Sequence, residues 1–215
     1  MDKDKFSITD TVLMDYTPLK GDVAEIGCGE GRMTRVLADI SRGLKAVEPD
    51  RSAIEKAKAV LPDIEFYCRS AEDTGLNSYS FDVVLFSLSF HHVSDMESAL
   101  SEAFRLLRTD GEIVLIEPEE NCELMKICAV FDIEESRRLY EAKKCMSIYD
   151  ADFYPLRTFE PVWEFADADE LHRWLEDYYG GTEEQHLEVD RLLGDKVKDS
   201  PLLLDDRLTL ISGRL

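Results

Sequence analysis

The stretch Val23-Ala24-Glu25-Ile26-Gly27-Cys28-Gly29-Glu30-Gly31 decides the fold of this chain. It begins as a short apolar strand and continues as a turn with three glycines, after which residues 31–40 carry apolar side chains at helical spacing. Glycine at a strand-to-helix turn lets the backbone bend sharply and lets a ligand approach where a side chain would collide. A second apolar run ends at Glu48, whose carboxylate is placed to accept hydrogen bonds from two neighbouring ribose hydroxyls. Together these features predict a nucleoside-binding site.

The composition is that of a globular and strongly acidic protein. The 215 residues include 25 Lys and Arg against 46 Asp and Glu, so the formal net charge is −21. No run of Lys and Arg is visible, which argues against a nucleic-acid partner. No apolar run approaches the roughly 18 residues of a membrane span, and the first residues lack a secretory signal, so we expect a cytoplasmic protein without a membrane span. Five cysteines at irregular spacing do not form the ligand pattern of a structural zinc site.

The first half of the chain alternates between strand and helix patterns. A nearly continuous apolar run, residues 81–87, is typical of a strand buried on both faces. Such alternation predicts a parallel sheet with right-handed crossovers. The expected strands are 23–26, 44–48, 64–68, 81–87 and 112–117, and the expected helices are 7–16, 31–40, 50–60 and 95–107.

The second half is less regular. Residues 121–148 predict one or two helices, 158–165 a strand, 167–178 and 182–196 further helices, and 207–212 a last strand. We therefore expect an α/β fold: a Rossmann-like, doubly wound, mostly parallel sheet of seven strands with an antiparallel edge strand and a helical insertion after strand five. It would form a single domain with four parts: an N-terminal helical segment (1–20), a cofactor-binding core (21–118), a helical lid (119–156) and a strand-helix-strand ending that completes the sheet (157–215).

Five motifs in this order resemble the class I S-adenosylmethionine-dependent methyltransferases, particularly the type 11 subgroup that methylates small molecules. The likeness covers Val23 to Glu117, close to half of the chain. The motifs are Glu25-Ile26-Gly27-Cys28-Gly29-Glu30-Gly31, Val47-Glu48-Pro49-Asp50, Ser70-Ala71-Glu72-Asp73, Ser80-Phe81-Asp82-Val83-Val84 through Phe90-His91-His92-Val93, and Leu106-Leu107-Arg108-Thr109-Asp110-Gly111-Glu112.

The resemblance implies a role for each motif in binding S-adenosylmethionine, with no metal needed. Ser70 departs from the family, in which an Asp accepts from the adenine amino group; either Glu72 takes over or apolar packing holds the adenine. The implied contacts are Glu25 and the backbone of Gly27, Cys28 and Gly29 on the methionine moiety, Gly31 packing onto the helix, Glu48 and Pro49 at the ribose, Ser70, Ala71 and Glu72 at the adenine, and Ser87 and Leu88 beside the sulfonium.

His91 and His92 form the only pair of groups near the expected methyl donor that titrate close to neutrality. One imidazole would deprotonate or orient the methyl acceptor. The alternative is that the pair only starts the next helix and packs against it. The other two histidines, His172 and His186, lie on predicted exterior helices and are expected at the surface.

The acceptor site is harder to predict. The helical lid carries apolar and sulfur-bearing residues suited to an adaptable pocket, and Tyr149, Phe153, Tyr154 and Arg157 are the candidates for acceptor contact. Ser87-Leu88-Ser89-Phe90 lacks the Asn/Asp-Pro-Pro-aromatic sequence of the amino-methylating enzymes that act on nucleic acids.

The favoured function is transfer of the methyl group to O, N, S or C of a small molecule by in-line displacement, with S-adenosylhomocysteine as product. Two alternatives remain open. One is a nicotinamide-dependent oxidoreductase, although its fingerprint is GxGxxG and Arg32 occupies the sixth position here. The other is a catalytically silent module that binds the cofactor and regulates a partner. The chain could be a monomer or a homodimer.

Overall fold

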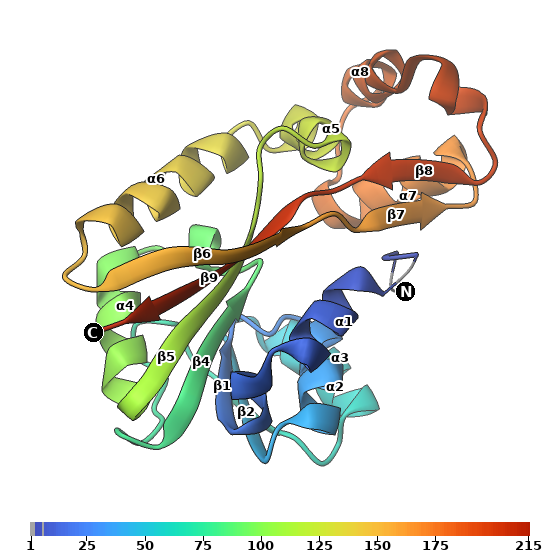
Figure 1. The fold of residues 1–215 in the computed structure, drawn as a ribbon. Helices are drawn as coiled ribbons and strands as arrows, with labels where there is room; N and C mark the ends of the chain where they lie inside the picture. Colours follow the sequence, from blue (N-terminus) through green and yellow to red (C-terminus); the bar gives the residue numbers. More distant parts are fainter. Residues whose placement is uncertain (1–2, 6) are drawn as a thin grey trace. The chain divides into compact units, whose positions relative to one another are not determined.

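The computed structural model describes residues 3–5 and 7–215 (Figure 1). They divide into two compact units. The larger unit consists of Asp10–Glu117, Glu141–Thr158 and Thr209–Leu215, and the smaller one of the segment up to Thr9 with Pro118–Tyr140 and Phe159–Leu208. Each unit has a hydrophobic core of its own.

A seven-stranded sheet forms the centre of the larger unit, with the strand order β3-β2-β1-β4-β5-β9-β6. The first five strands in this order pair in parallel. Figure 1 shows β9 running against β5 and β6, so the antiparallel strand lies inside the sheet and β6 forms its edge. This architecture confirms the predicted fold class. The strands are β1 (Asp22–Ile26), β2 (Gly43–Glu48), β3 (Glu65–Cys68), β4 (Phe81–Ser87), β5 (Leu107–Pro118), β6 (Asp152–Phe159) and β9 (Leu208–Arg214).

The strand order reverses between β1 and β4. Right-handed crossovers on the two sides of this point place their helices on opposite faces of the sheet, and Figure 1 shows α4 apart from α1, α2 and α3. A parallel sheet of this kind binds its ligand outside the carboxyl ends of the strands at the reversal. The helices that precede or connect these strands are α1 (Ile8–Asp15), the 3₁₀ turn η1 (Thr17–Lys20), α2 (Arg32–Ile40), α3 (Arg51–Val60), the 3₁₀ turn η2 (Phe90–His92) and α4 (Met96–Leu106).

The expected elements of the first half are all present, with one clear shift. Strand β5 begins at Leu107, not at residue 112, because Leu107 already pairs with Phe81 before an irregularity in the ladder between Phe81 and Val83. The expected elements left the polar residues 108–110 between a helix and a strand. They belong to the exposed start of a strand whose remainder is buried.

The second half settles one open prediction and corrects two others. Residues 121–148 form two helices, α5 (Glu123–Phe131) and α6 (Glu135–Ile148). The single strand predicted over 158–165 is wrong: β6 ends at Phe159, and β7 (Val162–Phe165) belongs to a separate two-stranded sheet. Residues 152–156, assigned to the helical lid, lie in β6.

The smaller unit pairs β7 in antiparallel fashion with β8 (Leu202–Asp205), a strand that the sequence analysis missed. Its helices α7 (Ala168–Tyr179) and α8 (Glu183–Leu193) follow β7, and the 3₁₀ turn η3 (Gly194–Lys198) leads to β8. Asp167 caps α7, and Thr182 caps α8 through a reciprocal capping box with Gln185. Across residues 3–5 and 7–215, no helix has the length and apolarity to cross a membrane.

Candidate functional site

The residues singled out by sequence follow the carboxyl ends of neighbouring strands. The glycine turn follows β1, Glu48 ends β2, Ser70 to Glu72 follow β3, and Ser87 ends β4. The register of the parallel ladder brings Ile26 opposite Val47 and Phe86, and Glu48 opposite Cys68. The topology therefore gathers these motifs at one edge of the larger unit's sheet, beside the strand reversal.

The glycine turn has backbone angles that residues with a side chain rarely adopt. Gly27 and Gly29 have φ angles of +76° and +53°, in the left-handed region that glycine adopts without strain. A Cβ on Gly27 would lie 2.4 Å from the Cβ of Ser89, whereas a Cβ on Gly29 would meet no atom within 4 Å. The amides of Gly27 and Cys28 both donate to the Val47 carbonyl, at 2.8 and 3.1 Å. The turn is thus fixed to β2 and open at Gly29.

Glu48 is held in place by the backbone around it. Its Oε2 accepts from the Gly29 amide at 2.9 Å, and its Oε1 accepts from the Asp50 amide at 3.0 Å. The side chain is half-buried. Each carboxylate oxygen therefore keeps acceptor capacity for a further donor, such as a ribose hydroxyl.

Glu25 is a buried carboxyl next to the glycine turn. It is 2% exposed, and its Oε2 accepts from the Thr34 hydroxyl at 2.6 Å. Burial raises the pKa of Glu25 to about 8, against the opposing effects of the Thr34 hydrogen bond and the charge of Arg32. Such a group becomes ionised readily when a cation arrives beside it.

The end of β4 carries an unsatisfied hydroxyl and an unusual backbone. Ser87 Oγ is buried, and it has no hydrogen-bond partner within the part of the chain that the structure describes. The next residue, Leu88, has a φ of +55°, and its amide donates to the Ile116 carbonyl at 2.8 Å. Ser89 Oγ donates to the Ile26 carbonyl at 2.7 Å, which ties this loop to β1. An orphaned buried hydroxyl and backbone strain are both features that cluster at ligand sites.

The segment expected at the adenine is more open. Ser70 is exposed and forms an isolated bridge with Asp73, while Ala71 and Glu72 are half-buried. Glu72 Oε1 accepts from the Asp95 amide at 3.1 Å, where Asp95 caps α4. Glu72 is therefore already engaged in fixing the start of α4, and one of its oxygens remains for another donor.

The two adjacent histidines have different environments. His91 is 2% exposed, and its Nδ1 is hydrogen-bonded to Oε2 of Glu117, which is also buried. The other oxygen of Glu117 accepts from the Phe90 amide at 3.2 Å. His92 is exposed, with its ring centroid 4.0 Å from that of His91. Glu117 was missed by the sequence analysis, although a single carboxylate ending an apolar strand at the same sheet edge was a usable signal.

The four residues expected at the acceptor do not join this group. Tyr149 stacks on Phe104 of α4, with ring centroids 5.7 Å apart, and its hydroxyl lies 3.0 Å from Ser101 Oγ. Phe153 also packs against Phe104. Phe153 and Tyr154 are the second and third residues of β6, so they lie at its amino end, away from the carboxyl edge. Arg157 lies further along β6 and is exposed.

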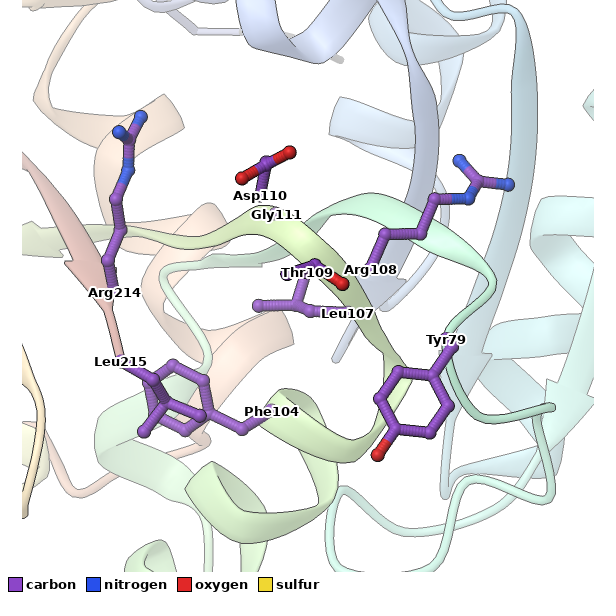
Figure 2. Close-up of a pocket in the computed structure, with 9 residues that line it drawn as sticks. All are labelled: Tyr79, Phe104, Leu107, Arg108, Thr109, Asp110, Gly111, Arg214 and Leu215. Carbon is purple, nitrogen blue, oxygen red and sulfur yellow. The ribbon is translucent and has the colours of Figure 1, made fainter.

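A pocket of about 430 Å³ lies at the amino end of β5, and Figure 2 shows Arg108 and Arg214 on opposite sides of it. Both guanidinium groups already pair with carboxylates, Arg108 with Asp22 and Asp82 and Arg214 with Glu112. The pocket is at the opposite end of the strands from the glycine turn and is separate from the candidate site. Its lining is Tyr79, Phe104, Leu107, Arg108, Thr109, Asp110, Gly111, Arg214 and Leu215.

Comparison with known proteins agrees with the architecture. A family model described as a methyltransferase domain matches residues 24–115. The chain is 29% identical to the ubiquinone/menaquinone biosynthesis C-methyltransferase UbiE of Campylobacter jejuni over 102 residues, which are 44% of this chain and 43% of that protein. It is 29% identical to an uncharacterized methyltransferase of Anoxybacillus flavithermus over 115 residues, 52% of this chain and 54% of that one. The chain thus spans about half the length of these curated relatives.

The crystal structure of the YcgJ protein from Bacillus subtilis has the same fold over nearly the whole chain. Its TM-score is 0.70 at 17% sequence identity, covering 95% of this chain and 97% of that one. The doubly wound sheet with its glycine turn at the strand reversal is the architecture that many nucleotide-binding α/β proteins share. The sequence matches add a narrower likeness for part of the chain: residues 24–115 are similar to the methyltransferase domain of S-adenosylmethionine-dependent enzymes.

Proposed function

We propose that this protein binds S-adenosylmethionine at the glycine turn and catalyses transfer of its methyl group to a small-molecule acceptor. The observation that carries the proposal is the hydrogen bond between Glu48 and the Gly29 amide, which joins the open turn after β1 to a carboxylate at the end of β2. This combination offers backbone and carboxylate partners for an adenosyl group at the strand reversal.

The residues of the site fit such a cofactor. Glu25 and the backbone of Gly27 to Gly29 would hold the methionine moiety, Glu48 the ribose hydroxyls, and Ala71 the adenine. The buried hydroxyl of Ser87, which no described residue hydrogen-bonds, could bind a polar group of the cofactor at the place expected for the sulfonium end. When bound, the cofactor supplies a methyl group that its sulfonium has already activated, so the protein's main task is to position the acceptor.

The histidines divide between two roles. Glu117 binds His91 and the Phe90 amide at once, and this arrangement fixes the loop between β4 and α4. His92 is the exposed imidazole of the pair. In this proposal, His91 is a positioning residue and His92 meets the acceptor, where it accepts or orients the acceptor's proton.

A small-molecule acceptor agrees with the charge of the protein. With a net charge of −21, the chain repels polyanions, and a neutral or cationic acceptor meets no such barrier. The attacked atom, whether O, N, S or C, is left open by this proposal.

Calorimetry and a transfer assay test the proposal together. We expect S-adenosylhomocysteine to bind the wild-type protein in a 1:1 ratio and NAD to give no heat. Glu48→Ala should weaken binding at least tenfold, because it removes both the ribose partner and the acceptor of the Gly29 amide. Asp63→Ala, an exposed carboxylate before β3, serves as the matched control.

Transfer itself is measured with donor carrying a labelled methyl group and a pool of small metabolites. Label in a small molecule, absent with Glu48→Ala, is the expected result. Binding of S-adenosylhomocysteine without any transfer would contradict the catalytic part and favour a silent module. Heat with NAD and none with S-adenosylhomocysteine would contradict the proposal as a whole.

A further inference from the structure

Two histidines of the smaller unit form a network that methyl transfer does not use. His172 lies on α7 and His186 on α8, and their Nδ1 atoms are 2.8 Å apart. Both were expected at the surface, but each side chain is only 22% exposed. The contact comes from two helices joined by the short connection at residues 180–182.

Each imidazole is also bound by a carboxylate from the opposite helix. His172 Nε2 lies 2.9 Å from Asp190 Oδ1 on α8, and His186 Nε2 lies 3.2 Å from Glu176 Oε2 on α7. Both helices thus carry a histidine and a carboxylate four residues apart, on the same face. The two carboxylates cross between the helices and leave the Nδ1 atoms facing each other.

The hydrogen-bond partners of the two rings favour a cation between them. An ionised carboxylate only accepts hydrogen bonds, so each Nε2 carries the proton that it donates. A neutral imidazole has a single N–H, so both Nδ1 atoms then present lone pairs to each other. The 2.8 Å contact is favourable only if a proton or a metal ion lies between them. Two neighbouring carboxylates add negative charge that favours such an ion.

We propose that His172 and His186 bind a divalent transition-metal ion of the zinc class through their Nδ1 atoms. A carboxylate on the outer nitrogen is the usual support of a metal-bound histidine, since it fixes the ring and raises its basicity. Imidazole nitrogen is a preferred ligand of zinc, copper and nickel. The ion would link α7 to α8 and stabilise the smaller unit.

The geometry needs only a small adjustment. With Zn–N distances of about 2.0–2.1 Å and tetrahedral angles, the two nitrogens would lie about 3.4 Å apart, so the rings must separate by roughly 0.6 Å. The partial exposure of both rings leaves room for water to complete the coordination. Asp190 and Glu176, which are 42% and 59% exposed, stay on the outer nitrogens and hold the two rings in place.

The test uses protein freed of metal with a chelator and titrated with ZnCl₂ by calorimetry, with MgCl₂ as the comparison. The variants are His172→Gln and His186→Gln. Glu184→Gln, an exposed carboxylate on α8 outside the network, is the matched control. We expect one zinc ion per chain, at least tenfold weaker binding in each histidine variant, no change in Glu184→Gln and no heat with magnesium.

Further measurements distinguish a loss of zinc binding from a loss of folding. Circular dichroism without metal verifies that both variants are folded. ¹⁵N NMR of the wild-type imidazoles should show the zinc-dependent change at the Nδ1 atoms of residues 172 and 186. At a hundredfold excess of zinc over Kd, the melting temperature should rise by roughly 5 °C or more.

Absence of zinc binding up to millimolar concentration would overturn the proposal and leave a shared proton as the occupant. Less than a tenfold loss in either histidine variant would also overturn it, because the zinc would then be bound elsewhere. Neither result would affect the proposed methyl transfer.

Discussion

The raised pKa of Glu25 couples cofactor binding to pH. Because burial favours the protonated carboxyl below about pH 8, and a ligand ammonium favours the carboxylate, binding must release a proton. We expect S-adenosylhomocysteine to bind about tenfold more tightly at pH 7 than at pH 6, measured by calorimetry in buffers of different ionisation enthalpy. Glu25→Gln should bind more weakly at pH 7 and lose this pH dependence. If the affinity of Glu25→Gln depended on pH as strongly as that of the wild type, the released proton could not be assigned to Glu25.

The same group has the opposite effect on the ligand-free protein. The folded state binds the Glu25 proton more tightly than the unfolded chain, whose pKa is near the ordinary 4.5. The stability that this group contributes is therefore complete below pH 4.5 and is lost as the pH rises to about 8. Glu25→Gln, which can still accept from Thr34, should flatten that part of the curve of unfolding free energy against pH.

His91 and His92 should respond differently to the same substitution. His92→Gln should lower kcat and remove an acidic limb from its pH profile, because the exposed imidazole meets the acceptor in the proposed mechanism. His91→Gln should lower stability by about 1–3 kcal/mol, since it disturbs a buried hydrogen-bonded pair with Glu117, and leave the shape of the profile unchanged. Urea unfolding and kcat measured from pH 5.5 to 9 distinguish them. An unchanged profile in His92→Gln would reject its role as a base.

At the scale of elements, the sequence predicts best where one physical signal dominates. The apolar run from Phe81 to Ser87 predicts β4 with both of its ends, because a strand buried on both faces needs no partner to be recognised. Strand β6 has no such continuous apolar run. It is mostly exposed, contains Pro155 and lies at the sheet edge, where proline is tolerated. Its pairing with β9, some fifty residues later, is a tertiary feature that local sequence does not encode.

In the candidate site, too, residues with a local sequence signal were predicted and a residue defined by a tertiary contact was missed. The glycine turn and Glu48 were predicted because their spacing is local and chemically distinctive. Glu117 was missed because it meets His91 only when β5 packs beside β4, 26 residues away. Tyr149 and Phe153 were assigned to the acceptor by residue type and by their place in the predicted lid, whereas in the structure they pack on α4.

The turn between β1 and α2 offers a matched test of ligand approach. Gly29 and Gly194 have similar φ angles, +53° and +57°, and a Cβ on either would meet no atom within 4 Å. Alanine should therefore destabilise the fold at both positions, by about 1–2 kcal/mol or more, because a positive φ disfavours any side chain and the ψ of −124° at Gly194 disfavours it further. Gly29→Ala should also weaken S-adenosylhomocysteine binding at least tenfold, because the new methyl group occupies the open side of the turn. Urea unfolding and calorimetry on both variants measure this; equal affinities would contradict a ligand at Gly29.

At the scale of the molecule, the two units have cores that share no residue. The larger core is built on the sheet around Val84 and Phe86, and the smaller one around Phe165 and Leu171. All the proposed cofactor contacts belong to the larger unit. Proteins open locally in units that correspond to separately packed regions. A bound ligand can therefore slow amide hydrogen exchange in one region more than in the other.

Hydrogen exchange followed by mass spectrometry can locate the cofactor on this basis. With saturating S-adenosylhomocysteine, amides of the turn and strand ends, including those of Gly27, Cys28 and Leu88, should exchange about tenfold more slowly, because the ligand binds only the closed form of this edge. Peptides covering β7 and β8 should change little, and NAD should protect neither unit. Protection confined to the smaller unit, or spread evenly over both, would contradict a cofactor site formed by the carboxyl ends of β1, β2 and β4.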